Sequence, residues 1–379
     1  MNAENTTYIH ELPEWPKFRW DDEALLANLS DVRHRQGRLI GRMEMLGFDL
    51  QAEASLNSLT EEVVKSSEIE GEVLDRDQVR SSLARRLGIE VAGLVPSDRD
   101  VDGAVEMMLD ATQNYASPLT KDRLFGWHAA LFPTGRSGMT RIAVGEWRTE
   151  ASGPMQVVSG VYGHETVHFE APEATRIDEE MAAFLDWFER ERGIDPVVKA
   201  AVAHLWFVTI HPFEDGNGRI ARAIADMALA RSEMIAQRFY SMSAQIRIER
   251  KAYYAALERT QKEELNITQW VLWFLGCLDR AFTGADSIVG NVMRKARFWE
   301  LLSSEQLNDR QMKVLNRLLD GFEGNLTSSK WAILTKASQD TAGRDIDDLL
   351  KRGVLVKNPG GGRSTSYSLV EPADASTVE

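Results

Sequence analysis

The sequence predicts a mostly α-helical fold, and three observations indicate it. Apolar residues recur at the three- and four-residue spacing of a helix through most of the chain. Helix punctuation is present at the expected places, with Pro196 where a helix begins and Gly71 where another ends. Strand-like texture is confined to two short regions, residues 140–171 and 354–369.

The N-terminal third is predicted to be an irregular arm followed by helices. Residues 1–20 are rich in Pro and Trp and are expected to pack on the first helix, which covers residues 21–46. A second helix is predicted over residues 52–70, just before Gly71. Further helices are predicted over residues 77–87, 98–115 and 120–131.

The middle of the chain is predicted to hold a β-hairpin and then a buried helix. The hairpin strands are expected at residues 155–161 and 166–169. Residues 197–210 are apolar nearly all round, which is typical of a helix in the core. More helices are predicted over residues 220–232, 249–264 and 268–281.

The densest set of chemical groups is the run His-Pro-Phe-Glu-Asp-Gly-Asn-Gly-Arg-Ile-Ala-Arg, residues 211–222. An imidazole can take a proton from a hydroxyl near neutral pH, so His211 is a candidate general base. Asp215 offers hard carboxylate oxygens to Mg²⁺. These two residues, next to a glycine-rich turn, predict a site for a nucleoside triphosphate.

The end of the run is suited to phosphate. Gly216 and Gly218 lack a Cβ, so the backbone can take positive φ and turn its N–H groups toward an anion, and Asn217 tolerates the same conformation and adds an amide donor. Arg219 and Arg222 share a helix face and can clamp phosphate oxygens. The alternative is an ordinary turn followed by a solvated arginine face. The sequence lacks Gly-x-x-x-x-Gly-Lys-Ser/Thr, so it has no P-loop.

At every fixed position this run resembles the signature of the Fic family, His-Pro-Phe-x-Asp/Glu-Gly-Asn-Gly-Arg-x-x-Arg. The family's usual activity is transfer of AMP from ATP to a protein hydroxyl. The resemblance implies that His211 deprotonates a Ser, Thr or Tyr of the target and that Asp215 holds Mg²⁺. It also implies an anion hole at Gly216, Asn217 and Gly218, with Arg219 and Arg222 on the outer phosphates.

The resemblance gives the hairpin a role as well. Fic enzymes have a flap over the active site, which aligns a segment of the target protein by strand addition. In this chain, Ser159, Gly160, Val161 and Tyr162 would line the nucleotide side of the flap.

Tyr253, Tyr254 and Gln261 allow two interpretations. Their helical spacing alone favours core aromatic residues. They also resemble the adenine pocket of Fic proteins, although the family more often has Asn where this chain has Gln261.

Residues 66–71, Ser-Ser-Glu-Ile-Glu-Gly, end the second predicted helix. Taken alone, Glu70 is a surface carboxylate at the unfavourable end of a helix dipole. The segment resembles the Fic inhibitory motif, Ser/Thr-x-x-x-Glu-Gly/Asn, in which Ser66 and Glu70 are the matched residues. The resemblance implies that Glu70 pairs with Arg222, takes it from the γ-phosphate and leaves ATP misaligned for transfer.

The C-terminal region differs in charge from the rest of the chain. Residues 307–370 hold ten Lys plus Arg and seven Asp plus Glu, whereas the whole chain has a net charge of -14. Helices predicted over 310–319, 328–337 and 339–351, then strands at 354–357 and 364–369, resemble a winged helix-turn-helix. Four aspartates in residues 339–348 disfavour DNA, so protein contact or a homodimer is favoured over DNA binding through residues 308–369.

Composition indicates a soluble, cytoplasmic protein without a membrane partner. The single cysteine, Cys277, excludes an intramolecular disulfide, and the N-terminus lacks a signal peptide. The 379 residues allow several domains. We expect a helical N-terminal extension with the inhibitory helix over residues 1–95, a Fic-type core over 96–290, a winged-helix-like domain over 300–370 and a disordered tail over 371–379.

The sequence therefore predicts a Fic-type protein adenylyltransferase that uses ATP and Mg²⁺ and is autoinhibited by Glu70. Two alternatives stay open. One is an enzyme that removes AMP from a modified protein, or performs both reactions. The other is a DNA-binding regulator whose Fic-type core senses nucleotide.

Overall fold

The computed structural model describes residues 7–91, 93–160, 166–303, 305–319, 321–322, 324–359 and 365–370. It divides into two compact units: Met1–Ile89 with Val95–Ile288 (unit 1), and Glu90–Leu94 with Val289–Glu379 (unit 2). We describe each unit by itself. The predicted tail, and Val161 and Tyr162 of the predicted flap, lie outside the described residues. The division into domains expected from the sequence stays a prediction.

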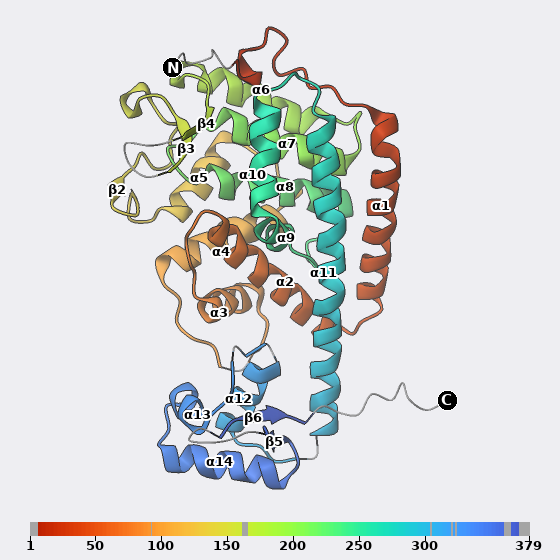
Figure 1. Ribbon diagram of the computed structural model, residues 1–379, viewed down its shortest axis with the longest axis vertical. Coiled ribbons are helices and arrows are strands. Elements are labelled where there is room, and N and C mark those ends of the chain that lie inside the picture. Colours follow the sequence, from red (N-terminus) through yellow and green to blue (C-terminus); the bar gives the residue numbers. More distant parts are fainter. Residues whose placement is uncertain are drawn as a thin grey trace. The chain divides into compact units, whose positions relative to one another are not determined.

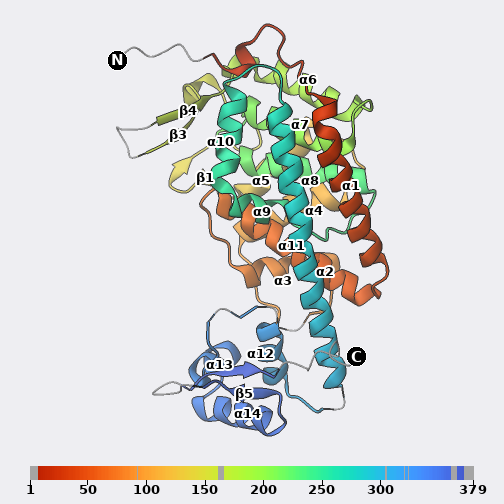
Figure 2. The same cartoon turned by 45° about the vertical axis from the view of Figure 1, so that its right-hand side comes forward.

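The predicted fold class is confirmed, because the structure is mostly helical with small antiparallel hairpins (Figures 1 and 2). The α-helices that begin in unit 1 are α1 (Asp22–Glu44), α2 (Phe48–Ile69), α3 (Arg76–Leu87), α4 (Arg99–Gln113), α5 (Lys121–Leu131), α6 (Ile177–Arg190), α7 (Pro196–Ile210), α8 (Asn217–Glu233), α9 (Met242–Ile248), α10 (Arg250–Gln261) and α11 (Thr268–Leu301). Short 3-10 helices lie at Ile9–Glu11, Glu150–Ser152 and Ala174–Arg176.

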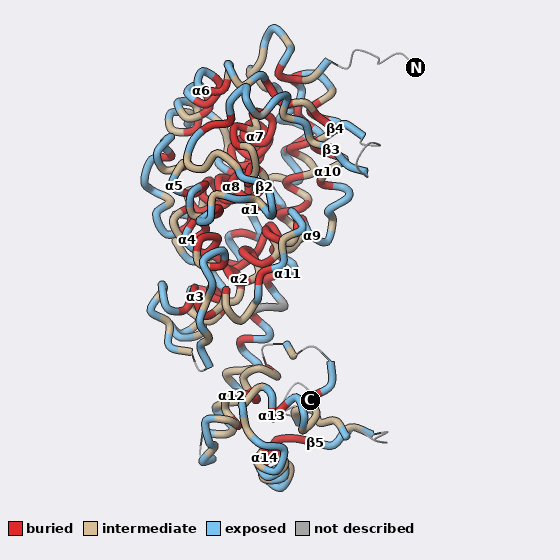
Figure 3. Tube along the Cα trace, turned by 90° about the vertical axis from the view of Figure 1, so that its left-hand side faces the viewer, coloured by how far each residue is buried: buried red, intermediate tan, exposed pale blue. Residues whose placement is uncertain are grey.

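Helices α7 and α8 form the centre of unit 1 and pack against each other. Every residue of α7 from Val197 to Ile210 is buried, as Figure 3 shows by colour. The Asp195 side chain caps α7 by accepting a hydrogen bond from the Val197 N–H at 2.7 Å. A rigid, buried helix therefore leads directly into His211.

Two hairpins lie in unit 1. The predicted one is present as β3 (Gln156–Ser159) and β4 (Thr166–Glu170), with a bulge between Val157 and Val158. The other, β1 (Arg136–Ser137) with β2 (Thr140–Arg141), was not predicted, and neither were α6 and α9. Strands of two residues are too short to carry an alternating pattern.

Unit 2 contains α12 (Asp309–Leu319), α13 (Ser328–Thr335), α14 (Gln339–Lys351), β5 (Leu355–Lys357) and β6 (Tyr367–Leu369). These elements share an apolar core that includes Val314, Trp331 and Ile346. A further bridge joins Leu326 to Tyr367 beside the β5–β6 ribbon. The order of elements matches the predicted pattern, and the winged-helix assignment itself stays a prediction.

Candidate active site

His211 sits where α7 ends, and its backbone is in the left-handed region with φ of 52°. Its Nδ1 lies 3.1 Å from the Val208 carbonyl oxygen. A carbonyl can only accept, so Nδ1 carries the proton and Nε2 keeps its lone pair. Burial lowers the pKa of His211 below its ordinary value, which keeps the ring neutral at neutral pH. Both features suit a general base.

Arg148 fixes the end of α7, a role the sequence did not reveal. Its Nε donates to the His211 carbonyl at 2.8 Å, and its backbone N–H donates to the Pro212 carbonyl at 2.9 Å. The side chain is 3% exposed, and burial lowers its pKa to about 10, so it remains a cation at neutral pH. This buried cation satisfies carbonyls that the helix end leaves unpaired.

His128, on α5, supports the loop after His211. Its ring stacks on Phe213 with centroids 4.1 Å apart. Its Nδ1 accepts from the Gly145 N–H at 3.1 Å, so its Nε2–H donates to the Asp215 carbonyl at 3.2 Å. Burial lowers the pKa of His128 to about 4. A lone histidine in a helix gives no sequence signal for this role. Phe213, on which His128 stacks, is fully buried.

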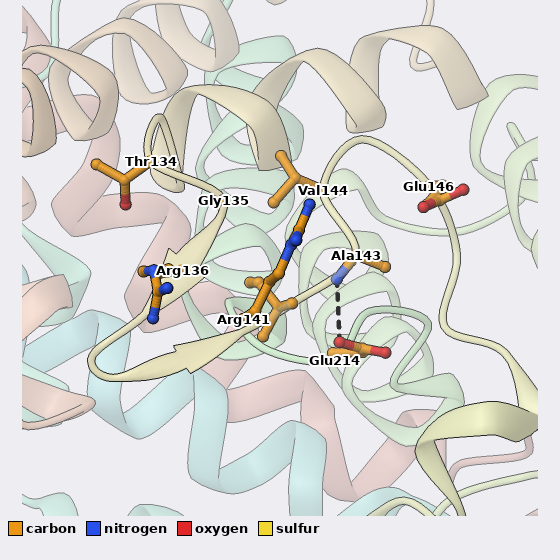
Figure 4. Close-up of a pocket in the computed structure, with 9 residues that line it drawn as sticks. Thr134, Gly135, Arg136, Arg141, Ala143, Val144, Glu146 and Glu214 are labelled. Atoms are coloured by element: carbon orange, nitrogen blue, oxygen red, sulfur yellow. Dashed lines mark hydrogen bonds between the residues drawn. The ribbon is translucent and has the colours of Figure 1, made fainter.

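Asp215 and Glu214 point to different partners. Ser137 donates its hydroxyl hydrogen bond to the Asp215 carboxylate, which also accepts from the Gly216 N–H at 2.5 Å. Glu214 accepts from the Ala143 N–H at 3.0 Å (Figure 4). Within the described residues, no three His, Cys, Asp or Glu side chains form a metal-binding group. Mg²⁺ at Asp215 would therefore draw its other oxygen ligands from water and a bound nucleotide, a usual arrangement for this ion.

The turn before α8 corrects two details of the sequence analysis. Gly216 has φ of 81°, as expected, but Gly218 lies inside α8 without positive φ. The Asn217 side chain accepts from the Phe213 N–H at 2.9 Å and donates to the Phe213 carbonyl at 2.8 Å. Asn217 is 1% exposed, and its side chain closes the loop on itself. Phosphate binding by Gly216, Asn217 and Gly218 stays a prediction, which would rely on backbone N–H groups.

Glu70 reaches Arg222, as the inhibitory motif implies. Arg222 Nη2 lies 2.8 Å from Glu70 Oε1. Arg222 also donates from Nε to the Ser66 hydroxyl at 2.9 Å and from Nη2 to the Ser66 carbonyl at 2.8 Å. Burial alone would lower the pKa of Arg222, but the charge and hydrogen bond of Glu70, together with Tyr253 and Tyr254, raise it above the ordinary value. A Cβ at Gly218 would overlap the Glu70 carboxylate, so the missing side chain admits Glu70 to the start of α8.

Arg219 is paired in the same way, by a residue that the sequence analysis did not single out. Its Nη1 forms an ion pair with Glu72, and its guanidinium lies 5.0 Å from the centre of the Phe132 ring. Glu70 and Glu72 flank Gly71, whose φ is 87°. One turn thus presents two carboxylates to the two arginines of the motif.

Tyr253 and Gln261 are buried, with exposures of 1% and 5%. The Tyr253 hydroxyl lies 2.9 Å from His204 Nε2, and Gln261 donates to the Thr209 hydroxyl at 3.2 Å. Tyr254 is partly exposed and donates to the Ile69 carbonyl at 3.4 Å. In this state Tyr253 and Gln261 are core residues, and adenine contacts from the three residues stay a prediction.

The flap is tied to α10. The Ser159 hydroxyl lies 2.6 Å from His168 Nε2, and His168 Nδ1 lies 2.9 Å from Glu258 Oε2. Ser159 and Gly160 are both exposed. Their contact with nucleotide stays a prediction.

Comparison with known proteins identifies this region. Residues 118–229 match the Fic/DOC family, and residues 8–89 match a domain of unknown function, DUF4172. Residues 118–229 therefore resemble a Fic domain. The chain is 43% identical over 56 residues to protein adenylyltransferase fic-1 of Caenorhabditis briggsae, which is 14% of this chain and 11% of that protein. It is 32% identical over 78 residues to a probable protein adenylyltransferase of Aquifex aeolicus, which is 21% of this chain and 24% of that protein.

Over 122 residues this chain is 29% identical to a uridine 5'-monophosphate transferase of Xanthomonas campestris. That match covers 30% of this chain and 22% of that protein. These matches thus span between about a tenth and a quarter of each relative's length. Among solved structures, a Fic family protein from Desulfovibrio desulfuricans matches with a TM-score of 0.50 and 22% identity, over 92% of this chain and 96% of that one. That likeness supports the Fic fold.

None of the helices in the described part of the chain combines the length and apolar character needed to cross a bilayer.

Proposed function

We propose that this chain is a protein adenylyltransferase that transfers AMP from ATP to a Ser, Thr or Tyr hydroxyl of a target protein, and that Glu70 inhibits it by holding Arg222. The Fic domain and the adenylyltransferases among its relatives support a nucleotidyltransferase. The geometry at His211 supports the chemistry.

In the proposed reaction, the target hydroxyl oxygen attacks the α-phosphorus of ATP and pyrophosphate leaves. His211 Nε2 takes the hydroxyl proton, because Nδ1 already donates to Val208. The N–H groups at the start of α8, with Arg219 and Arg222, stabilise charge on the phosphate oxygens. Mg²⁺ bound with Asp215 and the nucleotide would add positive charge at those oxygens.

The observation that carries the inhibition is the position of the Glu70 carboxylate. It lies against Gly218, in the first turn of α8, and pairs with Arg222 at 2.8 Å. A phosphate would seek the same N–H groups and the same cation. One guanidinium cannot serve the carboxylate and the γ-phosphate together, so the two compete.

The test is the Glu70→Gly variant, incubated with labelled ATP, Mg²⁺ and a cell lysate, with labelled proteins identified by mass spectrometry. Labelling should rise at least about tenfold over the unchanged protein, equivalent to roughly 1.4 kcal/mol of transition-state binding. Adding Arg222→Ala to Glu70→Gly should remove most of this gain. An unchanged rate in correctly folded Glu70→Gly protein would refute inhibition by Glu70.

The same incubation distinguishes the alternatives. A parallel arm with labelled UTP addresses the uridine monophosphate transferase among the relatives. Loss of AMP from a target modified beforehand by Glu70→Gly, on adding the unchanged protein, would instead support AMP removal. Glu70 would then have a second role, orienting the attacking water.

A further inference from the structure

A polar cavity of about 760 Å³ lies beside the loop that follows His211. Its lining comes from the β1–β2 hairpin, from the segment 142–146 and from Glu214 (Figure 4). No role for these segments is predicted from the sequence.

Two hydrogen bonds join this cavity to the candidate active site. Ser137, on β1, donates to the carboxylate of Asp215. The Ala143 N–H, in the segment after β2, donates to Glu214 at 3.0 Å. A molecule bound in the cavity would therefore contact segments that are hydrogen-bonded directly to Asp215 and Glu214, in the loop that follows His211.

The cavity contains two arginines, Arg136 and Arg141, which are partners directly across the β1–β2 ladder. Like charges directly opposite each other destabilise a strand pair. Both residues are exposed, and among the described side chains neither forms an ion pair with a carboxylate. Arg136 donates from Nη1 to the Met139 carbonyl at 2.9 Å, which leaves most of its donors available.

Another arginine-lined cavity in unit 1 provides a contrast. There, Arg35 pairs with Asp279 at 2.9 Å and Arg42 pairs with Asp286 at 2.5 Å. Those two guanidinium groups are neutralised inside the chain, whereas Arg38 in the same cavity has no ion pair among the described side chains. Arg136 and Arg141 have no such partner among the described side chains, so their guanidinium groups can bind an external anion.

The walls of the cavity favour a peptide over a polyphosphate. Glu146 and Glu214 also line it, and Figure 4 shows Glu146 on the side away from Arg136. Two carboxylates repel a triphosphate, which carries several charges. A peptide carries separate carboxylates, each matched to one guanidinium fork, and has N–H donors for the exposed Glu146.

We propose that the Arg136–Arg141 cavity docks an acidic segment of the target protein, with Asp or Glu side chains near the acceptor hydroxyl. This rests on the proposed transfer to a protein. The chain has a net charge of -14 and repels acidic partners at long range. The arginine pair beside the loop that follows His211 attracts acidic residues locally, at the place where the target must bind.

Binding is tested without the reaction, on the full chain. The probe is a fluorescein-labelled peptide with one Ser flanked on each side by three Glu, measured by fluorescence anisotropy. The double variant Arg136→Ala with Arg141→Ala should bind it at least about tenfold more weakly. The matched control, Arg99→Ala with Arg190→Ala, removes two exposed arginines elsewhere and should bind as the unchanged chain does. Reversal to Arg136→Glu with Arg141→Glu should favour the same peptide with Lys in place of Glu.

Activity in the Glu70→Gly background separates the possible occupants. The double alanine variant should raise KM for the protein target and leave ATP affinity unchanged. Equal peptide binding by the double variant and the control would overturn the proposal. A loss of ATP affinity in the double variant would also overturn it, by making nucleotide phosphate the occupant. Absence of any labelling by Glu70→Gly counts against the proposed transfer, whereas the peptide measurement still decides the docking.

Discussion

Three local constraints on His211 determine which of its ring nitrogens can accept a proton. The end of α7 fixes its backbone, Val208 occupies Nδ1, and Arg148 holds its carbonyl. Nε2 is the nitrogen that remains. Its role in proton transfer is therefore separable from nucleotide binding, which is assigned to α8.

This separation gives a prediction for His211→Ala. AMP transfer should fall at least about a hundredfold, because general-base catalysis contributes that much. ATP affinity, measured by calorimetry, should stay within about threefold, because the base acts on the target hydroxyl. Both are measured in the Glu70→Gly background. Full labelling by the variant would refute the assignment of His211 as the general base.

Asp215 and Glu214 give a second prediction, because their side chains have different partners. Asp215→Ala should remove Mg²⁺-dependent transfer, while Glu214→Ala should retain it, since Glu214 bonds to the Ala143 N–H. Mg²⁺ titration of ATP binding gives a readout besides activity. If Glu214 proves essential and Asp215 dispensable, the metal ligand is assigned to the wrong residue.

The turn after α2 is the element whose carboxylates pair with the two motif arginines. It carries both Glu70 and Glu72, while α2 itself is anchored by Glu62, which accepts from the Ser241 hydroxyl at 2.7 Å and the Ser243 N–H at 2.9 Å. The anchored helix leaves the turn as the part that can change locally. In the proposed inhibition, release of the two carboxylates requires only a rearrangement of a few residues after Ile69, while Ser66 in α2 keeps its hydrogen bonds with Arg222.

Glu72→Gln should therefore release Arg219 from its ion pair, with a smaller effect than that of Glu70→Gly. ATP affinity should rise about threefold, since the Glu72 side chain is 39% exposed and its ion pair is screened by water. Combined with Glu70→Gly, the gain should exceed that of either change alone. Calorimetric titration with ATP measures both. The control is Glu68→Gln, which removes a carboxylate that pairs with Lys65 and Arg247. An equal effect in the control would remove the specific role of Glu72.

At the scale of helices and strands, the sequence predicts the elements whose apolar residues form a strong pattern and misses those without one. Helix α14 begins and ends at the predicted residues, and α7 differs by one residue from the predicted range, since its apolar run is continuous. Helix α11 extends to Leu301, well past the predicted end at residue 281. The β1–β2 hairpin has no period to detect. As a result, the Arg136–Arg141 pair became visible only when the fold placed it beside Asp215.

Across the whole molecule, polar side chains buried without charge set the response to pH. His128 and His204 are essentially inaccessible, and burial lowers their pKa values to about 4 and about 3. Sequence could not single them out, because a lone histidine in a helix gives no sign of its burial or its partners. Both are neutral in the native state well below the pH at which they protonate in the unfolded chain.

The final prediction is a loss of stability on mild acidification. Below pH 6.5 the unfolded state binds protons at these histidines and the native state does not, so stability falls as pH decreases from 6.5 toward about 4. Between pH 7 and pH 5.5 the two histidines together should cost roughly 2 to 3 kcal/mol of unfolding free energy.

Urea unfolding at both pH values measures the difference. His128→Gln should reduce the pH-dependent part by about half of that amount. The decisive quantity is the change between the two pH values, since His128→Gln also loses contacts with Phe213 at every pH. If the pH dependence is the same in both proteins, His128 is protonated as readily in the native chain as in the unfolded one, and its Nδ1 does not accept a hydrogen bond from the Gly145 N–H.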